Sequence, residues 1–189
     1  ELKQRSIRTD SDLQFAVPGL TIRQTQGNNS LTYSIRGQSA DTFSGSPSAV
    51  IAYLDEVPLS ISGASTFYDL ESVQVLKGPQ GTLFGRNTTG GAVLYTTAKP
   101  TNETEGMLRV RGGNYELREV EGMVNIPLVD DKVLLRGAFN TLDRDGYIDN
   151  RLNGEELGEL GRDSGRLALT VRPVDRMENT TVVSYSETD

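Results

Sequence analysis

The sequence has no cysteine, no histidine and no tryptophan among its 189 residues. Without cysteine there are no disulfides, thiolate nucleophiles or zinc-thiolate clusters, and without histidine the commonest general base is missing. The lack of cysteine fits the cytoplasm and the periplasm equally well. These absences exclude thiolate, zinc-cluster and histidine chemistry, and we expect neither an enzyme nor a resident cofactor or metal.

Long apolar runs are also absent, since no segment approaches the roughly 20 residues of a membrane helix. A search for long apolar runs does not detect the strands of a membrane barrel, which carry only about ten residues of alternating polarity. Basic clusters are missing too: the net charge is -7, which excludes nucleic acid as a partner. Glycine is abundant, with 20 residues, and the hydrophobic content is only 35%, which favours strands and turns over helical packing.

Residues 1–100 are predicted to form a mixed α+β domain. Cap-type residues at 10–12 precede a short helix that Pro18 and Gly19 close. Residues 67–79 are predicted as a helical turn followed by a strand. The other expected strands are 20–24, 32–36, 49–57 and 92–97. Between the strand of the 67–79 segment and the strand 92–97, glycines 78, 81, 85, 90 and 91 predict a tight crossing of the backbone.

Residues 101–189 have a different pattern, which begins with a linker, TNETEG, and continues as alternating segments. Five strands are expected, at 107–111, 118–128, 132–142, 166–172 and 178–187. In each strand apolar residues oppose polar ones, as Val120 and Val124 oppose Glu119 and Glu121. A soluble antiparallel sheet with a covered apolar face produces this pattern, and so does a membrane barrel. The connections favour the barrel, because short turns accompany one long polar loop at 143–164.

Four ordered motifs resemble those of TonB-dependent outer-membrane receptors. DLQFAVPGLTIRQ, SIRG, VIAYLDEVPLS and VQVLKGPQGTLFGRNTTGGAVLYTTAKP are similar to successive parts of the plug of that family. Glu56 stands where the family usually has glycine, which puts the local turn in doubt. Any one motif alone is a weak signal, whereas four in the same order are specific.

The resemblance implies an α+β plug domain at residues 1–100, followed by antiparallel transmembrane strands of an incomplete β-barrel at 101–189. Five strands cannot enclose such a plug, which needs about 22, so the resemblance implies a fragment. The implied function is import of a large scarce solute, such as a ferric siderophore, cobalamin or a glycan, across the outer membrane of a Gram-negative bacterium. Its implied partners are that solute, the TonB energising complex and outer-membrane lipid.

The resemblance also implies site residues. In the family an arginine of the plug pairs with barrel carboxylates, which implies a lock between plug and barrel because a buried charge must be paired. The lock residues here are Arg36, Arg86, Glu119 and Glu121. Substrate is expected at two loops, 38–47 and 59–66, since loops carry recognition. The residues expected to face substrate are Gln38, Asp41, Phe43, Ser60, Ser62 and Phe67.

Other readings remain at this point. A soluble β-rich binding or adhesion module fits the alternation equally. A hydrolase using Asp55 and Glu56 is disfavoured, because neighbouring strand residues point to opposite faces. The glycine cluster lacks the P-loop order of lysine and hydroxyl, and the DRDGYID segment lacks the order of an EF-hand.

Overall fold

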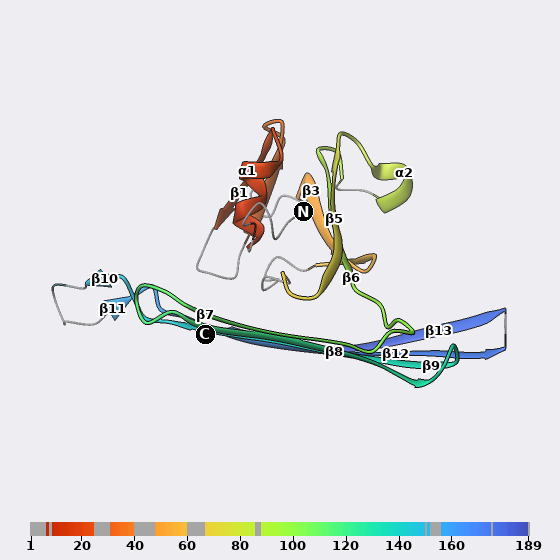
Figure 1. Ribbon diagram of the computed structural model, residues 1–189. Coiled ribbons are helices and arrows are strands. Elements are labelled where there is room, and N and C mark those ends of the chain that lie inside the picture. The colour runs from red at the N-terminus through yellow and green to blue at the C-terminus, as the bar shows by residue number, and fades with distance from the viewer. Residues whose placement is uncertain are drawn as a thin grey trace. The chain divides into compact units, whose positions relative to one another are not determined.

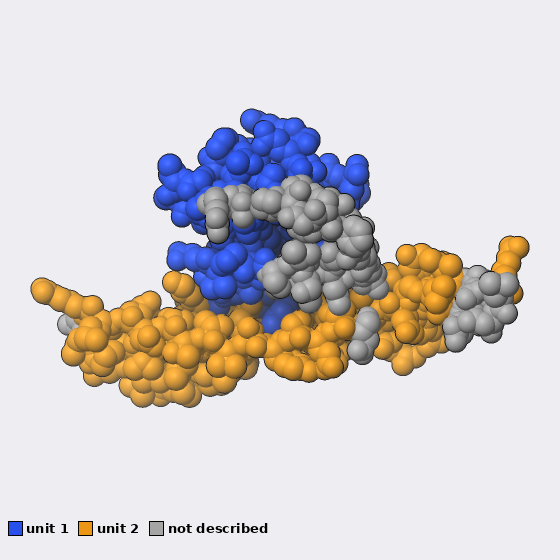
Figure 2. Space-filling view, turned by 180° about the vertical axis from the view of Figure 1, so that it is seen from behind, with its two compact units in different colours: residues 1–98 blue, residues 99–189 orange. Residues whose placement is uncertain are grey.

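The computed structural model describes residues 7, 9–24, 31–39, 48–59, 67–85, 88–149, 151, 156–174 and 176–188. Two compact units divide the chain, residues 1–98 and residues 99–189 (Figure 2). In the described residues, no helix is both long and apolar enough to cross a membrane.

Unit 1 begins with a short helical segment, η1 (Asp10–Asp12) followed by α1 (Leu13–Ala16) (Figure 1). The Thr9 backbone N–H donates to the Asp12 carboxylate at 2.9 Å, which satisfies one amide at the start of the helical turn. Pro18 and Gly19 follow, and Gly19 has φ +82°, a conformation that glycine adopts without strain. The Lys77 ammonium donates to the Pro18 carbonyl at 2.8 Å and ties this end to the sheet. The predicted helix is confirmed.

A hairpin and a mixed sheet complete unit 1. The hairpin pairs β1 (Leu20–Gln24) with β2 (Leu31–Ile35). The sheet has the order β4-β3-β6-β5 and contains β3 (Val50–Leu54), β4 (Val57–Pro58), β5 (Leu70–Lys77) and β6 (Gly91–Thr97). Beneath them lies one apolar core. Its buried residues are Ile7, Leu13, Leu20, Ile22, Tyr33, Ile35, Val50, Ala52, Val93 and Tyr95.

The structure of unit 1 differs from the sequence prediction in three details. The expected strand 49–57 is divided by a turn at Asp55 and Glu56, with φ +47° and +70°. The expected helical turn after Phe67 is a bend, with Asp69 at φ +49°. The glycine crossing contains a helical turn that was not predicted, α2 (Gly81–Phe84). Local backbone geometry in turns, which the polarity pattern does not encode, explains all three.

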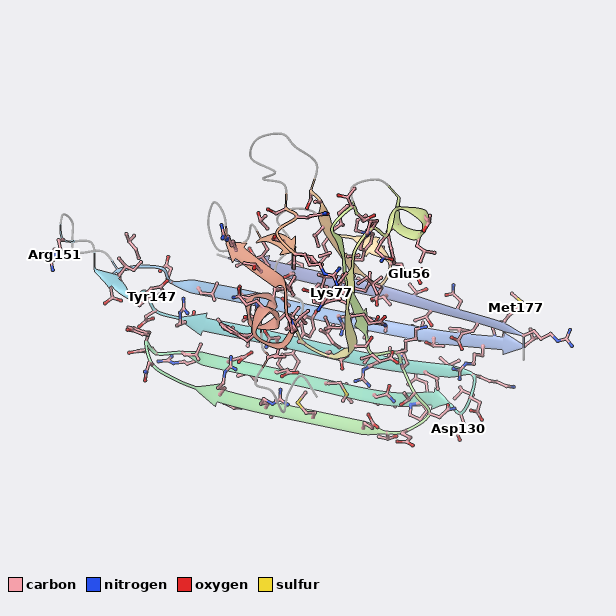
Figure 3. The ribbon with its side chains drawn as sticks, turned by 90° about the horizontal axis from the view of Figure 1, so that it is seen from above. Glu56, Lys77, Asp130, Tyr147, Arg151 and Met177 are labelled. Atoms are coloured by element: carbon pink, nitrogen blue, oxygen red, sulfur yellow. The ribbon has the colours of Figure 1, made fainter. Side chains whose placement is uncertain are left out.

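Unit 2 is an antiparallel sheet of five long strands with the order β13-β12-β9-β8-β7. Its strands are β7 (Glu105–Gly112), β8 (Arg118–Val129), β9 (Val133–Arg144), β12 (Leu160–Val174) and β13 (Met177–Thr188). Figure 3 labels Tyr147 at one end of this sheet and Asp130 and Met177 at the other. Each strand pairs with its neighbour in sequence, apart from the small hairpin of β10 (Ile148–Asp149) and β11 (Glu156–Leu157).

All five predicted strands are present, but β12 begins six residues earlier than its predicted start at Arg166. The loop predicted at 143–164 is therefore shorter, because β9 reaches Arg144 and β12 starts at Leu160. Polar side chains at Arg162 and Ser164 hid this part of β12 from a search for apolar alternation. Their backbones pair with Leu142 and Asn140 of β9 in regular register.

Candidate functional site

The two faces of the unit 2 sheet differ in polarity, and the apolar face is the exposed one. Residues directly opposite one another on neighbouring strands share a face. One such row runs Val124, Gly137, Leu167 and Val183. Leu167 is 52% exposed and Val183 is 66% exposed. The other exposed apolar side chains of these strands include Leu108, Val110, Ile126, Phe139 and Tyr185.

The opposite face carries buried polar side chains. One row runs Glu121, Asn140, Ser164 and Ser186, and its first three members are buried. The Asn140 amide donates to Glu119 at 3.0 Å, and the hydroxyls of Ser164 and Ser186 lie 3.0 Å apart. A sheet of a water-soluble protein arranges its faces the other way, with the apolar side chains covered.

Two ion pairs link β7 to β8 on this polar face. The Arg109 guanidinium donates to Glu121 at 2.5 Å, and Arg111 pairs with Glu119. The two glutamates that the sequence suggested for a lock are therefore close together, each opposite an arginine of the adjacent strand. These pairs neutralise both carboxylates within unit 2.

Phe139 and Gly122 fit together on the apolar face. They lie opposite each other on β9 and β8, and a Cβ built on Gly122 would overlap the Phe139 ring. The ring thus occupies the space that a side chain at 122 would need. The sequence analysis did not identify this pair. A glycine opposite an aromatic residue is a recognisable pattern, but it can be found only once the register of the two strands is known.

Two loops meet at the Tyr147 end of the sheet (Figure 3). The rings of Tyr115 and Tyr147 have centroids 6.0 Å apart, and the Arg144 guanidinium lies 5.2 Å from the Tyr147 ring centre. The Asp145 backbone N–H donates to the Tyr115 carbonyl at 2.9 Å. Sequence reasoning missed this contact because it joins residues from two separate connections.

A buried carboxylate ties the helical segment of unit 1 to its strands. Asp10 is 4% exposed, and its Oδ1 accepts from the hydroxyls of Tyr95 at 2.6 Å and Tyr33 at 3.1 Å. Burial, reinforced by the nearby Asp10 charge, raises the pKa of both tyrosines well above the usual value. Both hydroxyls therefore stay protonated and can donate. The Asp10 Oδ2 atom is buried without a hydrogen-bond partner.

Asp55 has a structural role in the turn between β3 and β4. Its two carboxylate oxygens accept from the Thr97 backbone N–H at 2.9 Å and the Thr97 hydroxyl at 2.7 Å. Glu56, labelled in Figure 3, follows in the same turn. Asp55 and Glu56 lie in a turn and not on a strand. The prediction that they point to opposite faces of a strand was therefore wrong. Both Asp55 oxygens already accept hydrogen bonds.

The glycine crossing places β5 and β6 in close contact. The N–H of Gly78 donates to the Gly90 carbonyl at 3.0 Å, and that of Gly90 donates to Ala49 at 2.8 Å. Gly91 has φ +146°, and a Cβ there would overlap the Leu76 carbonyl oxygen. The predicted need for glycine holds at this position, because the backbone of β5 fills the space.

The other predicted site residues lie in unit 1 or outside the described residues. Arg36 is exposed at φ +52°, and its backbone N–H donates to the Gly19 carbonyl at 2.8 Å. Gln38 is exposed and bridges to Ile35 through backbone hydrogen bonds. Phe67 is half-buried, with its ring edge-on to Tyr95 at 5.6 Å. The residues outside the description are Asp41, Phe43, Ser60, Ser62 and Arg86.

None of the described residues forms a cluster of histidine, cysteine, aspartate or glutamate side chains that could hold a metal ion. The described arrangement offers buried hydrogen bonds, paired charges and exposed apolar surface.

Residues 1–92 match the model of the TonB-dependent receptor plug domain. These residues belong to the plug-domain family of the TonB-dependent receptors. The family consists of transport receptors rather than enzymes, and the resemblance stated from the motifs is confirmed. So is the fold class, a plug followed by antiparallel strands that do not close into a barrel.

Relatives extend the likeness over both units. The chain is 31% identical over 182 residues to the pesticin receptor of Yersinia pestis. The matched region covers 93% of this chain and 26% of that receptor. A 63-residue stretch is 35% identical to the ferrioxamine B receptor of Salmonella typhimurium, covering 33% of this chain and 9% of that receptor. The chain thus spans about a quarter of the length of the pesticin receptor.

Solved structures show the same fold. The ferric yersiniabactin uptake receptor of Yersinia pestis superposes with a TM-score of 0.91 at 25% identity, covering 100% of this chain and 30% of that one. The pyoverdine outer membrane receptor of Pseudomonas aeruginosa superposes with a TM-score of 0.79 at 19% identity, covering 99% of this chain and 26% of that one.

Proposed function

We propose that this chain is the plug and first barrel strands of an outer-membrane receptor that imports a ferric siderophore. The observation that carries the proposal is the exposed apolar face of the unit 2 sheet. Four of its strands have 12 or more residues, enough for the roughly 9 to 11 that a membrane strand needs. A contiguous apolar surface of this kind marks contact with lipid or a partner.

The domain boundaries in this proposal are 1–100 for the plug and 101–189 for the barrel strands. The proposed location is the outer membrane of a Gram-negative bacterium. The proposed cargo follows the names of the relatives, which include receptors for ferrioxamine B and ferric yersiniabactin. The proposed energy source is the TonB complex, after which the family is named.

The decisive experiment measures uptake by the complete receptor in a Gram-negative strain that makes no siderophore of its own. Radiolabelled iron is supplied as ferric hydroxamate, ferric catecholate or ferric phenolate chelates, in cells with and without the TonB complex. We expect energy-dependent uptake of at least one chelate. Uptake that is equal in both strains, or no uptake of any chelate, would overturn the proposal. Unit 2 remaining in solution as a folded monomer without detergent would instead support a soluble binding module.

The proposed lock between plug and barrel consists of Arg36, Arg86, Glu119 and Glu121. Glu119 already pairs with Arg111, and Glu121 already pairs with Arg109. In the proposed lock, a plug arginine would be an additional partner for these two glutamates. Charge reversal at Arg36 is expected to raise the passive entry of a large antibiotic, and Arg36→Lys is the matched control. Equal antibiotic entry in all three receptors would remove Arg36 from the lock.

The proposed substrate-facing residues are Gln38, Asp41, Phe43, Ser60, Ser62 and Phe67. Replacing residues 39–46 of the complete receptor by a Gly/Ser linker is expected to weaken substrate binding. Unchanged affinity in a direct titration would refute that placement. Phe67 calls for a milder change, Phe67→Leu, because its ring also packs against Tyr95.

A further inference from the structure

The first residues of unit 2 are fixed to the sheet of that unit. The sequence predicts a polar linker at residues 101–106 because it contains no apolar periodicity. In the structure β7 already starts at Glu105, and residues 101–103 are held by side chains of β8 and of the turn that follows it. A polar composition here therefore does not indicate a freely moving connection.

Asn125 makes most of these contacts. Its amide nitrogen donates to the Thr101 carbonyl at 2.9 Å, the Thr101 hydroxyl at 3.0 Å and the Glu103 carbonyl at 2.5 Å. Its amide oxygen accepts from the Thr101 backbone N–H at 3.0 Å. The side chain is 0% exposed, and both ends of the amide are satisfied by the segment.

Asn102 makes a second attachment, to the turn between β8 and β9. Its amide oxygen accepts from the Asp131 backbone N–H at 3.0 Å, and its amide nitrogen donates to the Asp131 carboxylate. Both residues are exposed, so water competes for these bonds. The buried Asn125 contact is therefore the stronger of the two.

Detaching the segment would leave the buried Asn125 amide without partners. An unsatisfied buried polar group costs more free energy than the net gain from an average hydrogen bond. The plug residues that precede Pro100 can therefore move, in the proposed gating, without dragging the first strand of the sheet. We propose that Asn125 is a positioning residue of the gate, which fixes Thr101–Glu103 as the limit of plug movement. This inference rests on the proposed transport function.

The structural part of the test uses Asn125→Ala in the complete receptor, with Asn140→Ala as the matched control. Asn140 is also a buried asparagine on the same face, but its side chain bonds Glu119 and Arg162 and not the segment. We expect hydrogen exchange of the Thr101 amide to accelerate at least tenfold in Asn125→Ala alone. A spin label at Thr104→Cys, in a chain that has no cysteine of its own, is expected to become mobile in the same variant.

The functional part measures entry of a large hydrophilic antibiotic while the receptor is importing. We expect Asn125→Ala to leak in cells with the TonB complex and not in cells without it, because the missing anchor matters only when the plug is pulled. Leakage in both strains would mean general damage to the barrel and would overturn the positioning role. Absence of leakage despite fast Thr101 exchange would overturn it too.

If Asn125→Ala does not assemble, Asn125→Asp is used, which keeps the acceptor for the Thr101 N–H and removes the three donated bonds. Asn102→Ala, at the exposed attachment, is expected to give a smaller effect in the same direction. Failure of the transport proposal would be distinct, since the unmodified receptor would import no ferric chelate while the exchange difference at Thr101 persisted.

Discussion

Unit 1 and unit 2 differ in where their strands place apolar side chains. In unit 1 the apolar side chains of β3 and β6, such as Val50 and Val93, are buried in a core. In unit 2, Phe139 of β9 and Leu167 of β12 are exposed, while Asn140 and Arg166 of the opposite face are buried together with Leu134 and Ala168. The continuous apolar run VIAYL of β3 indicates a buried strand, whereas the alternation in β9 and β12 identifies a two-faced sheet without saying which face meets solvent.

The difference also concerns charge. Unit 1 buries Asp10 among two tyrosine hydroxyls, whereas unit 2 places charged pairs along adjacent strands. A small core holds a buried carboxylate by hydrogen bonds, and a sheet with a polar interior face distributes charges in rows. In the proposed membrane placement, lipid outside and a polar interior account for the second arrangement.

The largest effect is expected from a charge on the apolar face of unit 2. Leu167→Lys should destabilise the complete receptor in a bilayer by about 2 to 4 kcal/mol, since a lysine near mid-bilayer depth must leave water. Unfolding in urea from lipid vesicles measures this change. The matched control is Leu83→Lys in unit 1, which is 78% exposed and should change stability by less than about 0.5 kcal/mol. Equal losses of stability in the two variants would contradict the proposal that Leu167 contacts lipid and Leu83 does not.

Alkaline pH should destabilise unit 1 through Tyr33 and Tyr95. Their pKa values are raised in the folded state, so the folded protein retains protons that the unfolded chain has lost. Stability is complete below about pH 10 and falls above it, by about 1.4 kcal/mol per pH unit for each tyrosine.

Urea unfolding at pH 9 and pH 11, followed by circular dichroism, checks this slope. The double variant Tyr33→Phe, Tyr95→Phe should lose most of the slope. Tyr53 is still present in the double variant, and burial raises the pKa of Tyr53 as well, so a smaller slope should remain. A slope that is the same in the double variant would contradict the assignment to this pair.

Glu56→Gly should stabilise unit 1 by about 1 kcal/mol. Both central residues of the turn between β3 and β4 have positive φ, and glycine adopts this conformation without the strain that a side chain adds. The urea midpoint of the complete chain measures the gain. Glu56→Ala, which removes the carboxylate and keeps the Cβ, is the control and should not give the same increase.

The smallest effect is expected at Arg109. Its pair with Glu121 joins a guanidinium that is 45% exposed to a more buried carboxylate, so Arg109→Gln should cost about 0.2 to 1 kcal/mol. The loss should shrink further in high salt. A thermal-unfolding series over salt concentration would measure it, and a salt-independent loss of several kcal/mol would contradict partial exposure.

Much of the fold could be predicted from the sequence, because alternating polar and apolar residues indicate long strands. All five strands of unit 2 were found this way, and Gly91 was among the five glycines predicted to form a tight crossing. The start of β12 was missed because Arg162 and Ser164 continue the strand without apolar partners. α2 was missed because a segment of four residues is too short to show helical periodicity.

The candidate site was less predictable, since its contacts join residues that are distant in sequence. Asp10 meets Tyr95 across 85 positions, and Asn125 meets Thr101 across 24. The sequence suggested Glu119 and Glu121, but their partners Arg109 and Arg111 follow only from the register of β7 and β8. Which face of the sheet is exposed likewise required the structure.

The most direct test of the account measures the surroundings of successive side chains along β12 in the complete receptor. Single cysteines at 166–170 carry a spin label, and collisions with oxygen, which concentrates in lipid, are compared with collisions with a water-soluble nickel complex. We predict high oxygen and low nickel accessibility at Leu167 and Leu169, and the reverse ordering at Arg166, Ala168 and Thr170. High nickel accessibility at Leu167 and Leu169 would place the apolar face in water and contradict the account.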